Sequence, residues 1–198
     1  AKPNAHWDSA TIAPHIIRLS NAFKDAKLPQ RAKLLDMGCG WGSSCELGSF
    51  FDLEVFGLDI NQKFVDLVSI RNADNPNVSA RQGDFGNIPF EKDFDAILYY
   101  ESLHHGLKLW DTLQHSFEHL KLNGGKLILA GEPINDQWKN WGLRCDAESM
   151  YVMRKRGWFE SGWSMEFLTQ CLYKVGYVEV EVFEYPQPIG YVVVATKI

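Results

Sequence analysis

The chain has 198 residues, of which 45% are hydrophobic and 13% are aromatic. That length and composition are enough for one well-buried α/β domain, and we expect residues 1–198 to form this single domain. The chain carries 20 basic and 25 acidic residues, a formal net charge of -5. This charge disfavours proteins that bind nucleic acid mainly by neutralising its phosphates.

The four cysteines are scattered, with no CxxC pair among them, and these are Cys39, Cys45, Cys145 and Cys171. This pattern argues against a disulfide framework or a zinc knuckle, and it favours a reducing, cytoplasmic location. No apolar run approaches the roughly 20 residues of a membrane-spanning helix, and no signal-peptide pattern opens the chain. The first residue is alanine rather than methionine, so we leave open that the chain is part of a longer polypeptide.

Residues 1–30 predict an N-terminal helix, which we interpret as a lid. Asp8 and Ser9 are both candidates for the N-cap of this helix. Apolar residues then recur at helical spacing, at Ile12, Ile16, Ile17 and Leu19.

Apolar and alternating runs then predict seven strands, at residues 33–37, 54–59, 77–82, 94–100, 126–130, 178–182 and 191–195. Helical patterns follow the first, second and fourth strands, and a further helix is predicted from about Ser164 to a C-cap at Gly176. This alternation predicts a doubly wound, mainly parallel seven-stranded sheet of the α/β class. The last two strands predict a C-terminal antiparallel hairpin at the sheet edge.

A loop with glycine at three alternate positions, Gly38, Gly40 and Gly42, follows the first strand and precedes a helix from about Ser43. Glycine allows positive φ and lets a ligand approach the main chain, where the free N–H groups of the helix start can meet it. The spacing G-x-G-x-G, with Asp36 two residues before the first glycine, differs from the dinucleotide fingerprint G-x-G-x-x-G.

These motifs together resemble those of the class I S-adenosylmethionine-dependent methyltransferases. Residues 36–42 resemble the first motif of that family, D-x-G-C-G-x-G. Asp59 ends the second strand 23 residues after Asp36, and the pair Gly83-Asp84 resembles the third motif. The resemblance covers residues 33–132 and implies a Rossmann-like methyltransferase fold, with S-adenosylmethionine as the cofactor.

In this family, the corresponding acids bind the ribose hydroxyls and the adenine amino group of the cofactor. The resemblance implies that the cofactor-binding residues are Asp36, Gly38, Cys39, Gly40, Gly42, Asp59, Ile60, Gly83, Asp84, Phe85, Tyr100 and Glu101. The chemistry agrees, because ionised carboxylates are strong acceptors for a ribose diol and an exocyclic amine. The alternative is that Asp59 and Asp84 only cap the helices that follow them.

Two adjacent histidines, His104 and His105, follow the fourth strand and are our candidate catalytic residues. Methyl transfer to a hydroxyl needs the hydroxyl proton removed, and an imidazole with a pKa near 6.5 is suited to this task. We expect His104 to be the general base, with His105 as the alternative. Both side chains could instead pack or touch the cofactor, and Glu101 is a candidate for orienting the methionine amine or the acceptor.

His115, Glu118 and His119 match H-x-x-E-H, an inverted zinc-protease signature. If Leu113 and Phe117 face the core, helix geometry turns these three side chains toward solvent. We therefore predict no metal site.

Residues 134–162 form an aromatic-rich insertion without a clear period, which the resemblance places near the acceptor pocket. The candidate substrate-binding residues are His104, Trp138, Arg154 and Trp158. Aromatic rings here could stack on a sugar, and arginines could clamp an anion. The insertion could equally cover the sheet edge or form an interface, and His6 and Trp7 could close over the same site.

The sequence thus predicts an S-adenosylmethionine-dependent methyltransferase, most simply an O-methyltransferase of a small molecule or a saccharide. No Asn-Pro-Pro-Tyr segment follows the fourth strand, where Tyr99-Tyr100-Glu101-Ser102 stands instead, and this disfavours a nitrogen acceptor. A nucleic-acid partner is disfavoured by the net charge. The alternatives are an RNA or protein methyltransferase and a non-catalytic cofactor-binding scaffold.

Overall fold

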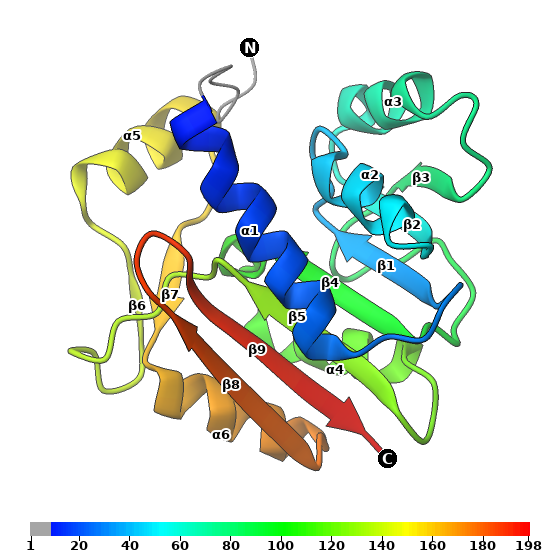
Figure 1. Cartoon of the computed structure of the whole chain (residues 1–198). Coiled ribbons are helices and arrows are strands. Elements are labelled where there is room, and N and C mark those ends of the chain that lie inside the picture. The colour runs from blue at the N-terminus through cyan, green and yellow to red at the C-terminus, as the bar shows by residue number, and fades with distance from the viewer. Residues whose placement is uncertain (1–8) are drawn as a thin grey trace.

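The computed structural model describes residues 9–198, so the predictions for His6, Trp7 and Asp8 lie outside the described residues. The helices are α1 (Ser9–Ala26), α2 (Ser43–Phe50), α3 (Gln62–Arg71), α4 (Leu109–His119), α5 (Ala147–Arg156) and α6 (Met165–Val175), with a short 3₁₀ helix η1 (Leu103–His105). The strands are β1 (Lys33–Met37), β2 (Glu54–Asp59), β3 (Val78–Gln82), β4 (Ala96–Tyr100), β5 (Gly125–Ala130), β6 (Trp141–Leu143), β7 (Ser161–Trp163), β8 (Glu179–Tyr185) and β9 (Gly190–Lys197). Figure 1 shows their arrangement.

Seven of these strands form one sheet in the order β3-β2-β1-β4-β5-β9-β8. The pairs among β1 to β5 are parallel, whereas β9 runs antiparallel to both β5 and β8. This confirms the predicted doubly wound sheet and its closing hairpin. The strand order reverses between β1 and β4, which is the point where open α/β sheets bind their ligands.

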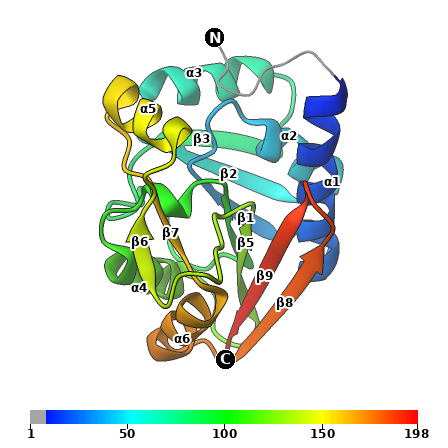
Figure 2. The same cartoon turned by 90° about the vertical axis from the view of Figure 1, so that its left-hand side faces the viewer.

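Period-2 alternation along the strands divides the core between the two faces of the sheet. Leu35 and Ile97 belong to the cluster that packs against α4 and α6, whereas Leu34 and Leu98 belong to the cluster on the other face. That second cluster includes residues of α1, α2 and α3. Figure 2 shows α1 on one side of the sheet and α4 and α6 on the other.

The insertion, residues 134–162, has regular structure that its sequence does not reveal. Strands β6 and β7 pair antiparallel as a separate two-stranded sheet, and α5 lies between them in the chain. Asp146 caps α5, and the helix ends at Gly157 with φ 71°. Because Ser149 is the buried residue of this helix, α5 has no apolar stripe that a period search could detect.

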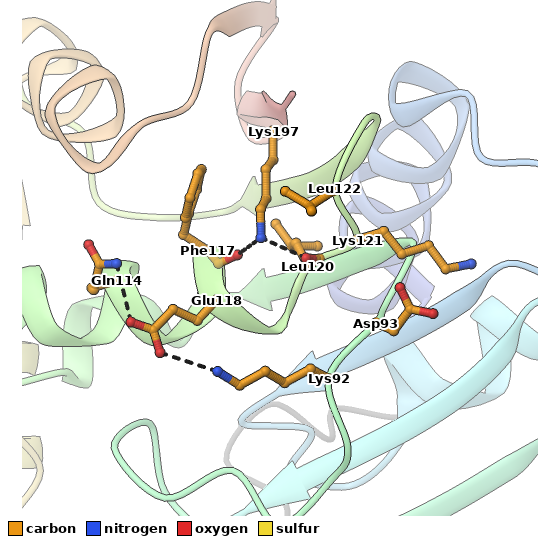
Figure 3. A pocket seen from close by; sticks show the side chains of 9 residues that line it. All are labelled: Lys92, Asp93, Gln114, Phe117, Glu118, Leu120, Lys121, Leu122 and Lys197. Carbon is orange, nitrogen blue, oxygen red and sulfur yellow. Dashed lines mark hydrogen bonds and ion pairs between the residues drawn. The ribbon is translucent and has the colours of Figure 1, made fainter.

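A hollow of about 600 Å³ lies where β4 and β5 begin, at the end of the parallel strands opposite the switch point. Figure 3 shows that Lys197 points into its wall, where Nζ donates to the carbonyl oxygens of Phe117 (2.6 Å) and Leu120 (2.8 Å). Glu118 accepts from Gln114 and contacts Lys92. The polar groups drawn there connect the C-terminal end of α4 to neighbouring segments of the same chain, at Lys197 and Lys92. We therefore assign this hollow a structural role.

Among residues 9–198, no helix is both long and apolar enough to cross a membrane.

Candidate active site

The glycine loop joins β1 to α2 in a conformation that only glycine adopts easily. Gly38, Gly40 and Gly42 have φ values of 83°, 50° and 81°. A Cβ on Gly38 would lie 2.9 Å from Ser102 Cβ, whereas a Cβ on Gly40 would meet no atom within 4 Å. Gly38 therefore packs against the segment after β4, while the main chain at Gly40 is open to a ligand.

Asp59, at the end of β2, holds this loop in place. Its Oδ2 accepts from the N–H of Gly40 at 2.9 Å, and its Oδ1 accepts from the N–H of Asn61 at 2.8 Å. Asn61, rather than Asp59, is the side-chain cap of α3, because its Oδ1 accepts from the N–H of Lys63. Each carboxylate oxygen of Asp59 keeps a second lone pair for a ligand hydroxyl. The next residue, Ile60, is 72% exposed, so an apolar surface lies beside this carboxylate.

Asp36 is buried beneath the glycine loop. Its Oδ2 accepts from the hydroxyl of Ser44 and from the thiol of Cys45, while its Oδ1 has no hydrogen-bond partner among the described residues. Burial raises the pKa of this carboxyl to about 6, and the hydrogen bonds from Ser44 and Cys45 lower it only in part. An unpaired buried acceptor of this kind fits a ligand that brings a donor.

The third-motif segment places Gly83 beside Asp59 and leaves Asp84 exposed. The N–H of Gly83 donates to the carbonyl of Asp59 at 3.1 Å, which ties the ends of β3 and β2 together. Asp84 Oδ1 accepts from the N–H of Gly86 at 2.7 Å and so forms a turn. Phe85 packs edge-on against Tyr99, with ring centroids 5.2 Å apart.

The end of β4 is tied to α1, a connection that the sequence did not indicate. The hydroxyl of Tyr100 lies 2.5 Å from Nδ1 of His15, and the guanidinium of Arg18 pairs with Oε1 of Glu101. Arg18 also donates to the carbonyl oxygens of residues 188 and 189, in the turn between β8 and β9. Glu101, expected to orient the methionine amine or the acceptor, is thus engaged by α1 in this structure.

His104 is held by Glu132, which follows β5. Nδ1 of His104 lies 2.9 Å from Glu132 Oε2, and that carboxylate also accepts the backbone N–H groups of Ser102, Leu103 and His104. Since Glu132 accepts a hydrogen bond from Nδ1 of His104, the proton of the neutral imidazole is on Nδ1 and Nε2 keeps its lone pair. The side chain of His104 is 8% exposed. Glu132 is not among the predicted site residues, although it lies two residues after the end of β5 and an acid at a strand end was the signal used for Asp59.

Glu160, beside β7, lies on the other side of the two histidines. Its Oε2 lies 3.7 Å from His104 Nε2, and its Oε1 lies 3.5 Å from His105 Nδ1. Arg144 Nη1 is 3.3 Å from Oε2 and orients this carboxylate. No periodicity or spacing in the insertion could single out Glu160, because only the β6–β7 pairing brings it to His104.

The two imidazoles have different electrostatic environments. Burial lowers the pKa of His104, but the carboxylates of Glu132 and Glu160 outweigh burial and hold it above its ordinary value. Burial and the neighbouring His104 lower the pKa of His105 to about 4. Burial raises the pKa of Glu132, but His104 and the backbone donors outweigh this and lower it overall. His104 is therefore the stronger base of the pair.

Of the aromatic residues expected to bind the acceptor, Trp158 lies at this cluster. Its ring centroid is 5.4 Å from that of His105, and the residue is 38% exposed. Trp138 packs under Gly162, where a Cβ would come within 2.5 Å of its ring. Arg154 lies on α5 and lines a separate shallow hollow of about 450 Å³ with Tyr151. Trp158 and His105 thus connect the buried pair His104–Glu132 to the surface.

The prediction for the H-x-x-E-H segment is correct for Glu118, which is exposed, and wrong for its two histidines, which are half-buried. Nδ1 of His115 lies 3.2 Å from the carbonyl of Phe85, and Nδ1 of His119 lies 2.7 Å from the carbonyl of His115. Helix α4 packs against the third-motif loop, which the sequence pattern of the helix alone does not show. Within residues 9–198 these side chains do not form a cluster of metal-ligating groups.

The seven-stranded order, the glycine loop and the acids at the strand ends define a Rossmann-like methyltransferase fold. Comparison with known proteins agrees. Residues 34–124 match the model of a family described as a methyltransferase domain. No curated protein sequence matches the chain significantly.

Solved structures match over most of their length. The Haloferax volcanii partner of the Trm112 methyltransferase activator has a TM-score of 0.73 at 16% identity, over 95% of this chain and 92% of that one. An S-adenosylmethionine-dependent methyltransferase from Mesorhizobium loti has a TM-score of 0.71 at 16% identity, over 91% and 98%. A Burkholderia thailandensis 1,6-didemethyltoxoflavin-N1-methyltransferase has a TM-score of 0.72 at 16% identity, over 93% and 78%. At this identity, the three structures establish the fold.

The fold is that of the class I S-adenosylmethionine-dependent methyltransferases, and the match of residues 34–124 to a methyltransferase domain agrees with the resemblance of the motifs.

Proposed function

We propose that the protein transfers the methyl group of S-adenosylmethionine to a hydroxyl of a small molecule or a saccharide, with His104 as the general base. The observation that carries this proposal is the His104–Glu132 pair. A buried carboxylate fixes the proton of the imidazole on Nδ1 and leaves the lone pair of Nε2 free to accept a hydroxyl proton.

The residues around the glycine loop fit the cofactor. Asp59 has lone pairs for the ribose hydroxyls, the main chain at Gly40 is open, and Asp36 Oδ1 lacks a donor. Ile60 offers an apolar surface beside Asp59, which suits a purine ring. We assign the adenine amino group to Asp84, whose carboxylate is exposed at the end of β3. When bound, S-adenosylmethionine supplies an electrophilic methyl group on a sulfonium.

The chain contributes alignment and proton transfer. His105 and Trp158 lie at the exposed side of the cluster, where an apolar sugar face or an aromatic ring can stack. The hydroxyl proton of the acceptor goes to His104 Nε2, and the resulting imidazolium is stabilised by the carboxylates of Glu132 and Glu160. Positioning of two reactants can contribute roughly 7–11 kcal/mol, and a general base roughly 10²–10⁴-fold in rate.

The test is a methyl-transfer assay with labelled S-adenosylmethionine against sugars, phenols, carboxylates and glycan fragments. His104→Asn should lower kcat about 10²–10⁴-fold with cofactor affinity unchanged, because it removes the base and leaves the glycine loop intact. Asp59→Asn should instead weaken cofactor binding. The control is His119→Asn, a half-buried histidine on α4 that we expect to leave turnover unchanged.

Turnover that survives His104→Asn would refute the role of His104. Transfer only to amines or carbon acids in the panel would refute the oxygen preference. An RNA arm belongs in the panel because Arg154, Lys155 and Arg156 are exposed on α5, and transfer to RNA alone would refute the small-molecule assignment.

A further inference from the structure

The two histidines and Glu160 form the one group of metal-ligating side chains that residues 9–198 bring together. One ring nitrogen of each histidine and one oxygen of Glu160 all lie within 4.8 Å of one another. His104 and Glu160 are buried and His105 is half-buried, so the group is reached from solvent along the side chain of His105.

The distances within this group are those of ligands around a gap rather than of hydrogen-bonded partners. His104 Nε2 and Glu160 Oε2 are 3.7 Å apart, beyond hydrogen-bonding range. Ligand atoms at about 2.1 Å from a tetrahedral ion lie about 3.4 Å from one another. The observed separation of 3.7 Å between His104 Nε2 and Glu160 Oε2 therefore needs only a small side-chain movement to close around an ion, and a ring nitrogen of His105 lies within 4.8 Å of the other two ligand atoms.

The hydrogen bonds behind both imidazoles are those typical of ligating histidines. A metal-bound histidine nearly always donates its other ring N–H to a carboxylate or a backbone carbonyl. Nδ1 of His104 is bonded to the carboxylate of Glu132, and Nδ1 of His105 is bonded to the carbonyl of Phe159 at 2.8 Å. Each Nε2 is then left unprotonated, as ligation requires.

We propose that His104, His105 and Glu160 bind a divalent first-row transition-metal ion of the zinc class. Two imidazoles and one carboxylate suit such ions, whereas Mg²⁺ and Ca²⁺ prefer sites built from oxygen alone. Three protein ligands leave at least one position for water or a ligand hydroxyl. Arg144, 3.3 Å from Glu160 Oε2, orients the carboxylate but repels a cation, so the affinity is lower than at a site without it.

A metal ion bound at this site, which the proposed function does not require, would affect methyl transfer. Nε2 of His104 cannot hold a metal ion and accept a proton at the same time. Bound Zn²⁺ should therefore inhibit methyl transfer, and a chelator should restore it.

The experiment is a titration of metal-free protein with Co²⁺, followed by its visible d–d absorption and reversed by Zn²⁺. Every variant carries Cys145→Ser, because that exposed thiol is close in sequence to Arg144 and could bind metal itself. We expect saturation at one ion per chain, with no displacement by excess Mg²⁺. Glu160→Gln and His105→Asn should each weaken binding at least about tenfold.

The matched control is the double variant His115→Asn/His119→Asn, which removes the H-x-x-E-H histidines and should leave Co²⁺ binding unchanged. Circular dichroism of Glu160→Gln, which keeps the volume of the side chain, separates loss of the site from loss of the fold. Absence of stoichiometric binding, or binding that the control variant abolishes and Glu160→Gln does not, overturns the metal site.

The general-base role of His104 and the metal site can be refuted independently of each other. Without metal binding, loss of turnover in His104→Asn would still support the base. With metal binding, a rise in turnover on adding Zn²⁺ would support the metal site and refute His104 as the base.

Discussion

Replacing Glu132 with glutamine should lower the pKa of His104. The carboxylate of Glu132 lies 2.9 Å from Nδ1 of His104, and it stabilises the imidazolium form. At about 4 Å between charge centres and an effective dielectric constant of about 20, their attraction is about 4 kcal/mol, an upper bound near three pKa units. Measured effects of such pairs are about 1–3 units. Burial of the imidazole is nearly the same in wild type and in Glu132→Gln. The loss of the carboxylate charge should therefore appear directly as a lower pKa of His104.

The assay is an NMR titration of the histidine ring nitrogens in metal-free protein, which requires no acceptor. In wild type, His104 should titrate above about 6.5, the ordinary histidine value, as the Nδ1–H tautomer. In Glu132→Gln, the midpoint should fall by about 1–3 units, and once an acceptor is known, the rising limb of kcat/KM should move to lower pH by the same amount.

His119→Asn is the control for assignment and should not move the His104 midpoint. An unchanged midpoint in Glu132→Gln, or a His104 that carries its neutral-state proton on Nε2, would refute the proposed orientation of the base.

Three further outcomes are expected. Asp36→Asn should stabilise the protein near pH 7 by up to about 3 kcal/mol, because the folded state holds the Asp36 pKa near 6, so this group disfavours folding increasingly as the pH rises from 4 to 6. Urea unfolding at pH 4 and pH 7 measures this difference. Gly38→Ala should destabilise by about 2–4 kcal/mol and weaken cofactor binding, whereas Gly40→Ala should cost only about 1–2 kcal/mol for its positive φ, as measured by thermal unfolding and calorimetry with S-adenosylmethionine. Arg18→Met should cost about 1–3 kcal/mol and increase amide hydrogen exchange in α1 and in the turn between β8 and β9, because it breaks the pair with Glu101.

For each of these predictions, a specific result would contradict the reasoning. If Asp36→Asn leaves the pH dependence of unfolding unchanged, the buried carboxyl is not protonated preferentially in the folded state. Equal losses in the two glycine variants would mean that the contact with Ser102 relaxes freely. Hydrogen exchange in α1 that stays at the wild-type level in Arg18→Met would show that apolar packing alone holds this helix.

The sequence by itself determined the sheet and the cofactor loop, because these depend on local signals. Strands β1, β2, β4 and β5 are short, mostly buried apolar runs, and such runs are visible without any tertiary information. Strand β3 is polar and has no fully buried residue, so its sequence signal is weaker. Positive φ at Gly38, Gly40 and Gly42 favours glycine, so the glycines themselves predict the conformation of the loop. The cap at Asn61 follows from the same local chemistry.

Only the tertiary structure decided how the candidate catalytic residues are arranged. Glu132 and Glu160 lie 28 and 56 residues after His104 and reach it from separate segments, one after β5 and one in the insertion. The helix α5 carries no apolar stripe, so the sequence of the insertion has no hydrophobic periodicity from which this helix could be predicted. The pairing of Arg18 with Glu101 likewise depends on how α1 packs across the sheet. Ion pairs and hydrogen bonds between distant segments leave no periodic trace in the chain, and for this reason the surroundings of the two histidines could not be derived from the sequence.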